Sequence, residues 1–327
     1  MSEFQLIANY FNQPSLTSVG DMPAELGIGD DCALLSLPDQ QQLAISIDTL
    51  VADVHFPAEA AAEQIGYRAL AVSVSDLAAM GAKPSWFTLA LTLPESDRSW
   101  LAQFAKGLSQ AANQFDIRLV GGDTTRGYLT ISIQVHGLVD PSRAMLRSKA
   151  AVGDLIYVSG TLGDAAAALK YVKSQPNLPE FTSSVVSQLY QRFYRPEPRI
   201  NLGQRLAALG VKCAIDISDG LLADLGHILE ESAKADHSVG AKLDLAALPV
   251  SQALLSEVDN ASAFNLALTG GDDYELCFTA PPQLAPQLSP LVEAGDITLI
   301  GKITAQPGIV DIYDQTIAVD QPGYQHF

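Results

Sequence analysis

Short acidic stretches with glycine, serine or threonine beside the acid recur along this chain. They lie at residues 27–31, 46–49, 75–77, 121–127, 216–220 and 270–273, each next to or within an apolar segment. Hard cations such as Mg²⁺ prefer carboxylate oxygens, and glycine-rich turns let backbone N–H groups approach phosphate oxygens. We therefore predict that the six stretches converge on one metal-rich site that handles phosphate.

Several of these carboxylates stand beside another acid or inside an apolar helix. Asp30 and Asp31 are adjacent and would repel each other if they were buried without a cation. Asp76 follows Ser73 and Ser75 in an otherwise apolar helical segment, where it is either a metal-facing carboxylate or a local cap or surface group. Each stretch taken alone has an ordinary explanation, because Asp and Gly are common turn residues. The recurrence of six such stretches favours the metal site.

The composition describes a folded, acidic protein of 327 residues. Hydrophobic residues make up 48% and charged residues 17%, and 19 basic against 37 acidic residues give a net charge of −18. This length suffices for two domains that each bury a core. The acidity disfavours nucleic acid or an anionic membrane as a partner, since nothing supplies a basic stripe. Divalent cations would reconcile the acidity with a phosphate substrate.

The cysteines and the N-terminal residues bear on the compartment. Cys32, Cys213 and Cys277 are widely spaced and form no Cys-x-x-Cys pair, so we expect reduced thiols. The first residues show no basic region followed by a long apolar stretch, and no run of about 18 apolar residues exists. We expect a cytoplasmic protein without a membrane span.

Hydrophobic periodicity predicts a mixed α/β or α+β chain with two domains, residues 1–145 and 146–327. Helices are expected at residues 3–12, 58–80, 99–115, 164–173, 202–209, 219–233 and 251–258. Strands are expected at residues 32–37, 43–48, 86–93, 118–120, 129–136, 155–159, 213–217, 241–245, 265–269 and 275–279. Residues 121–127 are expected to form a turn after a strand.

Several familiar nucleotide and metal motifs are absent from the sequence. There is no P-loop, no complete dinucleotide fingerprint, no protein-kinase signature, no calcium loop, no Gly-x-Ser-x-Gly elbow and no zinc pattern. Oxygen ligands and small residues remain. They suit phosphoryl transfer, because that chemistry depends on positioning and charge neutralisation more than on a general base.

In combination, the acidic stretches carry a family resemblance. Residues 25–33, 75–82, 121–127, 216–221 and 270–276 resemble the thiamine-monophosphate kinase family of the aminoimidazole ribonucleotide synthetase-like superfamily, and the likeness covers nearly the whole chain. The resemblance implies transfer of the γ-phosphate of ATP to thiamine monophosphate, with several Mg²⁺ ions, to give thiamine diphosphate. It also implies an N-terminal α/β domain, a C-terminal α+β domain, and a homodimer whose N-terminal sheets build a shared barrel.

The resemblance further implies a role for individual residues. The implied metal ligands are Asp31, Ser46, Ile47, Asp48, Asp76, Asp123, Asp216 and Asp219, with Ser46 and Ile47 acting mainly through backbone or hydroxyl oxygen. The implied ATP-binding residues are Gly122, Asp123, Arg147 and Ser218, and the implied acceptor-binding residues are His55, Asp272 and Gln321. No residue is implied as a general base; Asp123, Asp216 and Arg147 position metal and phosphate.

Two positions depart from the family pattern. The family commonly has Glu where this chain has Asp272, and an aromatic residue where this chain has Gln321. The Asp272 side chain is one methylene shorter, so it would reach the acceptor through water. At the second position, either stacking on the acceptor is lost or Tyr324 replaces the missing ring.

Two alternative interpretations remain. A superfamily relative of different specificity is the first, but selenophosphate synthetases usually carry a reactive Cys or selenocysteine with a Lys in a glycine-rich N-terminal segment, which this sequence lacks. The relative that matures hydrogenase ends in a functional Cys, whereas this chain ends in Gln325, His326 and Phe327. The second alternative, an acidic metal-binding or scaffold protein, would bind metal without turning over ATP.

Overall fold

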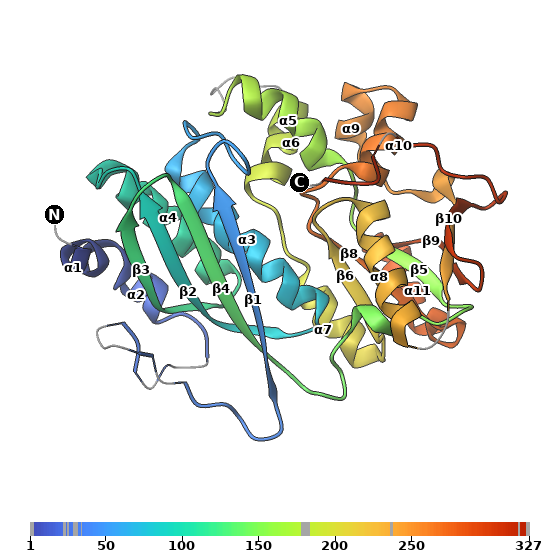
Figure 1. Ribbon diagram of the computed structural model, residues 1–327, viewed down its shortest axis with the longest axis horizontal. Coiled ribbons are helices and arrows are strands. Elements are labelled where there is room, and N and C mark those ends of the chain that lie inside the picture. The colour runs from blue at the N-terminus through green and yellow to red at the C-terminus, as the bar shows by residue number, and fades with distance from the viewer. Residues whose placement is uncertain are drawn as a thin grey trace. The chain divides into compact units, whose positions relative to one another are not determined.

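The computed structural model describes residues 3–21, 24, 26–28, 32–33, 35–177, 184–235, 238–319 and 321–324. The chain divides into two units, drawn in Figure 1. Unit 1 comprises Met1–Leu77, Ala82–Pro141 and Tyr171–Pro179, and unit 2 comprises Ala78–Gly81, Ser142–Lys170 and Glu180–Phe327. Two units were expected, and the exact boundary at residue 145 stays a prediction. No helix in the described part of the chain is long and apolar enough to cross a membrane.

Unit 1 is built on a four-stranded sheet in the order β1-β4-β2-β3. β4 pairs antiparallel with β1 and β2, and β3 pairs parallel with β2. The elements are α1 (Glu3–Leu6), the π-helical turn η1 (Ile7–Phe11), α2 (Pro14–Thr17), β1 (Gln42–Val51), α3 (Ala62–Ala79), β2 (Lys83–Leu93), α4 (Arg98–Gln114), β3 (Arg118–Arg126) and β4 (Thr130–Val139).

Residue alternation along β4 explains which face of this sheet is covered. Ile131, Ile133 and Val135 are fully buried, whereas the residues between them are half-buried. Helices α3 and α4 are joined by hydrogen bonds from Lys106 Nζ and Gln110 Nε2 to the Glu63 carboxylate, both at 2.8 Å. The opposite face of the sheet carries exposed apolar side chains on β1: Ile45 is 55% exposed and Ile47 is 60% exposed.

Unit 2 is built on a six-stranded sheet in the order β10-β7-β9-β5-β8-β6. Only the β10–β7 pair is parallel among the pairings of the described strands. The elements are η2 (Arg147–Lys149), β5 (Leu155–Ser159), α5 (Asp164–Ser174), α6 (Ser184–Tyr194), α7 (Ile200–Leu209), β6 (Cys213–Ile217), α8 (Leu221–Ala235), β7 (Gly240–Leu243), η3 (Leu245–Ala247), α9 (Gln252–Glu257), α10 (Asn260–Thr269), β8 (Glu275–Ala280), η4 (Pro282–Leu284), α11 (Ala285–Ala294), β9 (Ile297–Thr304) and β10 (Gly308–Asp311).

Both faces of the unit 2 sheet are buried, because successive residues of β5 enter different cores. Ile156 and Val158 pack in the core that includes residues of α8. Tyr157 packs in the core that includes residues of α7 and α11, where its ring stacks on Phe278 of β8 at 5.2 Å between centroids. Continuous apolar runs such as Cys213–Ile217 follow from burial on both faces.

Three element predictions were wrong. Residues 121–126 continue strand β3 instead of forming a turn, and residues 265–269 belong to helix α10, which Asp259 caps by accepting from Ser262 N at 3.0 Å. The described residues of 32–37 form no strand; Ala33 and Leu35 are apolar because they pack against the cluster around Trp86. Helix α11 was not anticipated.

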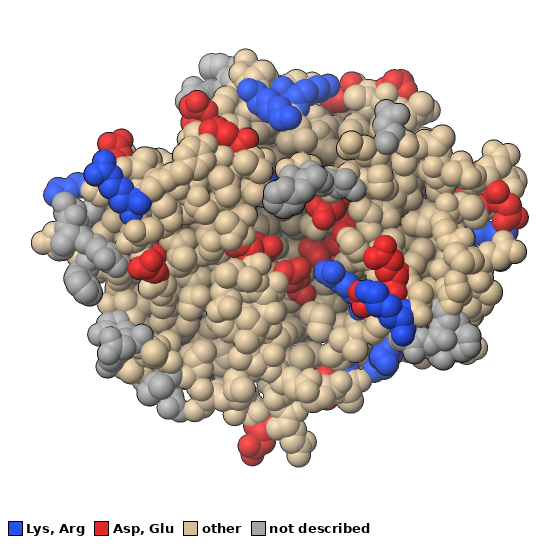
Figure 2. All heavy atoms as spheres, in the orientation of Figure 1, with Lys and Arg blue, Asp and Glu red and all other residues tan. Residues whose placement is uncertain are grey.

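Charged side chains are sparse on the face drawn in Figure 2. Most of that face belongs to uncharged residues, and the Lys, Arg, Asp and Glu residues of the described chain lie on it in small separate groups.

Candidate functional site

In unit 1, two predicted metal ligands meet where β1 adjoins α3. Ser46 Oγ donates a hydrogen bond to Asp76 Oδ2, so the half-buried Asp76 carboxylate faces β1. Asp48 lies two residues after Ser46 on the same side of β1 and accepts a hydrogen bond from Ser73. Burial and the Asp76 carboxylate raise the pKa of Asp48 to about 6. Because the Asp76 carboxylate disfavours the charged form of Asp48, a cation between the two side chains would be stabilising.

Asp123 lies at a different place in the same sheet. It is exposed on β3, paired with Ala90 of β2, whereas Asp48 is on β1. Strands β4 and β2 stand between β1 and β3, so the two aspartates are separated by three strand spacings, roughly 14 Å in all. Within unit 1 of a single chain, Asp123 therefore lies apart from Asp48 and Asp76.

His55 lies in the turn that follows β1. Its Nδ1 accepts a hydrogen bond from Val51 N at 2.9 Å, which assigns the proton of the neutral ring to Nε2. The half-buried ring is thus held by backbone and directs a donor away from the strand. A donor of this kind suits an anionic or carbonyl group of a ligand.

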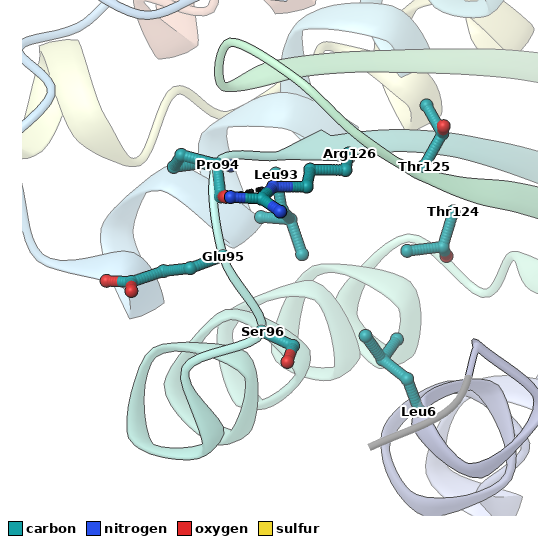
Figure 3. Close-up of a pocket in the computed structure, with 8 residues that line it drawn as sticks. All are labelled: Leu6, Leu93, Pro94, Glu95, Ser96, Thr124, Thr125 and Arg126. Atoms are coloured by element: carbon teal, nitrogen blue, oxygen red, sulfur yellow. Dashed lines mark hydrogen bonds between the residues drawn. The ribbon is translucent and has the colours of Figure 1, made fainter.

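Beyond Asp123, the end of β3 lines a hollow of about 540 Å³, shown in Figure 3. Thr124, Thr125 and Arg126 form one wall, and the loop after β2 and the side chain of Leu6 complete it. Arg126, the cationic residue in the lining, donates from Nε to Pro94 O at 3.2 Å. None of the predicted site residues is among the described residues that line this hollow.

In unit 2, three predicted site residues lie at the end of β6 and in the loop that follows it. The Asp224 carboxylate binds the backbone of this loop. Asp216 is the last residue but one of the strand and is 4% exposed, and Ser218 and Asp219 follow the strand. Asp224 Oδ2 accepts from the backbone N of Ser218, Asp219 and Gly220, each at 3.1 Å. Gly220 has a φ of +124°, which an L side chain rarely adopts.

This arrangement changes what the loop can offer to a phosphate. We expected its backbone N–H groups to approach the ligand, but the Asp224 carboxylate occupies them. Ligand contacts are left to side chains such as the Ser218 hydroxyl and the Asp219 carboxylate. Burial raises the pKa of Asp224 to about 6, and the neighbouring Asp219 carboxylate adds to the rise, against the lowering effect of the backbone donors.

A second loop of unit 2, residues 270–274, lies against the first. Asp272 N donates to Ser218 O at 2.8 Å, and Tyr274 N donates to Ile217 O at 2.8 Å. A Cβ at Gly271 would lie 2.5 Å from Ser218 O, so only glycine permits this approach. The Tyr274 hydroxyl donates to Asp272 Oδ1 at 2.9 Å. Ser218 and Asp272, predicted for ATP and for the acceptor, are therefore brought side by side.

The remaining predicted residues of unit 2 lie at its surface. Arg147 is exposed on η2, and its carbonyl accepts from Ser232 Oγ at 3.0 Å, which ties η2 to α8. Gln321 is also exposed. Tyr324 N donates to Asp219 O at 2.9 Å, so the last described residues run along the Asp219 loop and place the half-exposed Tyr324 ring beside it.

The predicted metal ligands are thus partly assembled. Ser46, Ile47, Asp48 and Asp76 share one region of unit 1, and in unit 2 Asp219 lies in the loop directly after β6, the strand that holds Asp216. Asp31 lies outside the described residues. Within the described chain, no group of three or more His, Cys, Asp or Glu side chains is arranged to hold a metal ion. The convergence of all these ligands on one site stays a prediction.

Sequence reasoning did not single out Asp224 or Tyr274, although both shape the site. One feature of the sequence could have indicated Asp224. It is an acid in the first turn of the helix that starts after Gly220, where backbone N–H groups lack intrahelical partners. The Tyr274 contact depends on the left-handed backbone of its loop, which no sequence pattern in this chain announces.

Two successive parts of the chain match the models of known protein families. The model of the AIR synthase related protein N-terminal domain matches residues 29–139, and that of the AIR synthase related protein C-terminal domain matches residues 151–314. The fold and its acidic loops therefore define an AIR synthase related protein.

Relatives that match over their full length show which family within this class the chain belongs to. The chain is 46% identical to the thiamine-monophosphate kinase of Escherichia coli strain K12 over 99% of this chain and 98% of the relative, and 32% identical to that of Bacillus subtilis over the full length of both. The thiamine-monophosphate kinase of Stenotrophomonas maltophilia superposes with a TM-score of 0.81 at 43% identity over 96% of each chain. A solved structure of AaThiL complexed with AMPPCP and TMP superposes with a TM-score of 0.79 at 30% identity over 89% of each chain. The chain belongs to the thiamine-monophosphate kinase family.

Proposed function

We propose that this protein transfers the γ-phosphate of ATP to thiamine monophosphate and releases ADP and thiamine diphosphate. The observation that carries the proposal is the 46% identity over 99% of the chain to a thiamine-monophosphate kinase. The AaThiL structure supports it, because that related protein is complexed with AMPPCP, an ATP analogue, and TMP. A cytoplasmic location accompanies the proposal, since ATP is the phosphate donor.

Magnesium is the proposed metal, and the donor set of the chain fits it. The groups at β1 and α3 are carboxylate and hydroxyl oxygens, which Mg²⁺ prefers. The raised pKa of Asp48 beside Asp76 is the response expected of carboxylates that lack a cation. Ser46, Asp48 and Asp76 would hold one ion, Asp123 another, and Asp216 and Asp219 further ions. When bound, Mg²⁺ neutralises charge on the phosphates of donor and acceptor.

The chain's own residues bind and align the two substrates. Gly122, Asp123, Arg147 and Ser218 serve the nucleotide, and His55, Asp272 and Gln321 serve the acceptor. A phosphate monoester oxygen is already anionic at neutral pH, so the transfer needs no general base and depends on in-line alignment. His55 donates from Nε2 to the acceptor and does not remove a proton. The transfer is direct, without a phosphoenzyme.

A homodimer completes the proposal. Ile45 and Ile47 are 55% and 60% exposed on the sheet face opposite α3 and α4, and unpartnered apolar residues of a sheet face favour association. Two sheets that meet through this face would bury these side chains and satisfy the open edges of β1 and β3 in a shared barrel. A dimer with twofold symmetry uses the same face of each copy.

The activity is tested by measuring ADP release with ATP, Mg²⁺ and different acceptors. We expect turnover with thiamine monophosphate and little with thiamine, whose hydroxyl would require a base. We also expect turnover to stop with excess chelator and to return with added Mg²⁺. Equal rates with and without thiamine monophosphate, or full activity in excess chelator, would reject the proposal.

A further inference from the structure

A buried ion cluster adjoins the Asp272 loop of unit 2 and has no role in the chemistry described so far. At its centre is Glu275, the first residue of β8, which is 0% exposed. Arg199 donates two hydrogen bonds to this carboxylate, from Nε to Oε2 at 2.6 Å and from Nη2 to Oε1 at 2.5 Å. Arg192 Nη2 donates to Oε1 at 2.9 Å, and Ser159 Oγ donates to Oε2 at 2.5 Å. Every oxygen of the buried carboxylate is thus satisfied by a charged or hydroxyl donor.

The cluster reaches the loop through Arg192. The same Nη2 that binds Glu275 lies 3.3 Å from Asp273 O, inside the loop, and 3.2 Å from Thr161 O, in the turn after β5. Both oxygens of the buried Asp273 carboxylate accept from Gly163 N, at 3.0 and 2.8 Å. The backbone of residue 273 is therefore anchored on one side, while its neighbour Asp272 is oriented by the Tyr274 hydroxyl.

This loop needs such support, because its backbone is unusual on both sides of Asp273. Asp272 has a φ of +69° and Tyr274 a φ of +51°, and L-residues rarely adopt this left-handed region unless surrounding contacts fix it. The two backbone hydrogen bonds to Ser218 and Ile217 depend on that conformation. A loop released from Arg192 would relax toward ordinary φ values and would turn the Asp272 carboxylate.

We propose that Arg192 and Glu275 are positioning residues for the acceptor site: they fix the left-handed backbone that aims Asp272. The assignment of Asp272 to the acceptor rests on the proposed function. The claim that Arg192 and Glu275 stabilise the loop does not rest on the proposed function, because it follows from contacts within the protein itself. Neither Arg192 nor Glu275 touches the substrates in this proposal.

The first test measures the loop without any substrate. Arg192→Lys keeps the charge, but its ammonium ends one bond short of the Nη2 position from which arginine binds both Glu275 and Asp273 O. Hydrogen exchange of a peptide spanning residues 270–276, which contains the amides of Asp272 and Tyr274, should be about tenfold faster in this variant. Arg205→Lys, a matched change at an exposed arginine of α7, should leave it unchanged. Unchanged exchange in Arg192→Lys would overturn the proposal.

The second test measures steady-state kinetics of the same variants with ATP and thiamine monophosphate. Arg192→Lys should raise the acceptor KM about tenfold, with the ATP KM within twofold and kcat within threefold of the parent. A general loss of structure would instead lower all parameters and the melting temperature together. Faster exchange with an unchanged acceptor KM would overturn the acceptor role of the cluster.

Tyr274→Phe provides a milder variant that keeps the ring and removes only the hydroxyl bonded to Asp272. It should raise the acceptor KM about fivefold while loop exchange stays at the parent rate, because the backbone remains anchored. An unchanged acceptor KM would contradict the proposal that this loop orients the Asp272 carboxylate for acceptor binding. If the parent protein forms no thiamine diphosphate, the proposed function fails, and the exchange measurement alone then decides whether the cluster holds the loop.

Discussion

Asp123 is an exposed residue of β3, and the proposed reaction requires its charge. Asp123→Asn keeps the shape of the side chain and removes its charge. We expect turnover to fall by at least about 100-fold, as for other groups that stabilise transition-state charge electrostatically. Steady-state turnover with ATP and thiamine monophosphate measures this, with the melting temperature as a control for folding. A near-parental rate would show that Asp123 is only a structural residue of the strand.

We expect the charge of Asp48 to lower the stability of the metal-free protein. Its pKa is about 6 in the folded protein against a usual 3.8, so folding favours the protonated form, and this stabilisation is lost as the pH rises from about 4 to 6. At pH 8 the ionised group therefore destabilises the fold, by about 3 kcal/mol. Asp48→Asn should raise the melting temperature at pH 8 by about 5 °C and should reduce the further gain from Mg²⁺.

Asp39→Asn is the matched control for this measurement, because Asp39 is exposed in the loop before β1. It should change neither the melting temperature nor the response to Mg²⁺. A lower melting temperature for Asp48→Asn in metal-free buffer would contradict the repulsion between Asp48 and Asp76.

At the scale of elements, the start of α8 is the support on which the Asp219 loop depends. Asp224→Ala leaves three backbone N–H groups, that of Gly220 buried and the other two partly buried, without their shared acceptor. We expect a loss of about 2 kcal/mol in stability and a rise of about tenfold in the ATP KM. Asp259→Ala, which removes the cap of α10, should lower stability without changing the ATP KM. Equal effects of both variants on the ATP KM would contradict a specific role of Asp224.

The elements with regular periodicity could be predicted from the sequence, and the irregular ones could not. Helix α4 and strand β4 follow their apolar spacing closely. Residues 121–126 were misjudged because Gly-Gly-Asp is a common turn sequence, yet pairing with buried β2 draws it into a parallel strand. Residues 265–269 hold a short apolar run that would also suit a buried strand, but the cap at Asp259 starts a helix that contains them. In both cases the tertiary partner or the cap outweighed local pattern.

The candidate site could be predicted as a set of residues but not as a geometry. Ser46, Asp48 and Asp76 come together as their types suggested, and so do Ser218 and Asp272. The separation of Asp123 from Asp48 follows from strand order, which the sequence does not encode locally. The supports from Asp224 and Arg192 depend on contacts between distant segments, so they became visible only in the folded chain.

At the scale of the whole molecule, the exposed face of the unit 1 sheet predicts self-association. Ile47→Asp places a charge among apolar residues that would be buried in a dimer, and should convert the protein to a monomer with at least about tenfold lower activity. Sedimentation velocity measures the mass. Val292→Asp, a matched change at a 40% exposed residue of α11, should leave the mass unchanged. A parent protein that is monomeric at micromolar concentration would contradict the proposed dimer.

The account as a whole claims direct transfer of one phosphate from ATP to an anionic phosphate acceptor, and label transfer tests this most directly. The purified protein is incubated with ATP carrying radioactive phosphorus at the γ position, Mg²⁺ and thiamine monophosphate. We predict one labelled phosphate in each thiamine diphosphate formed, matched by one ADP, and no label on the protein when the acceptor is omitted. Label trapped on the protein from ATP alone, or label released only as inorganic phosphate while thiamine monophosphate stays unchanged, would contradict the account.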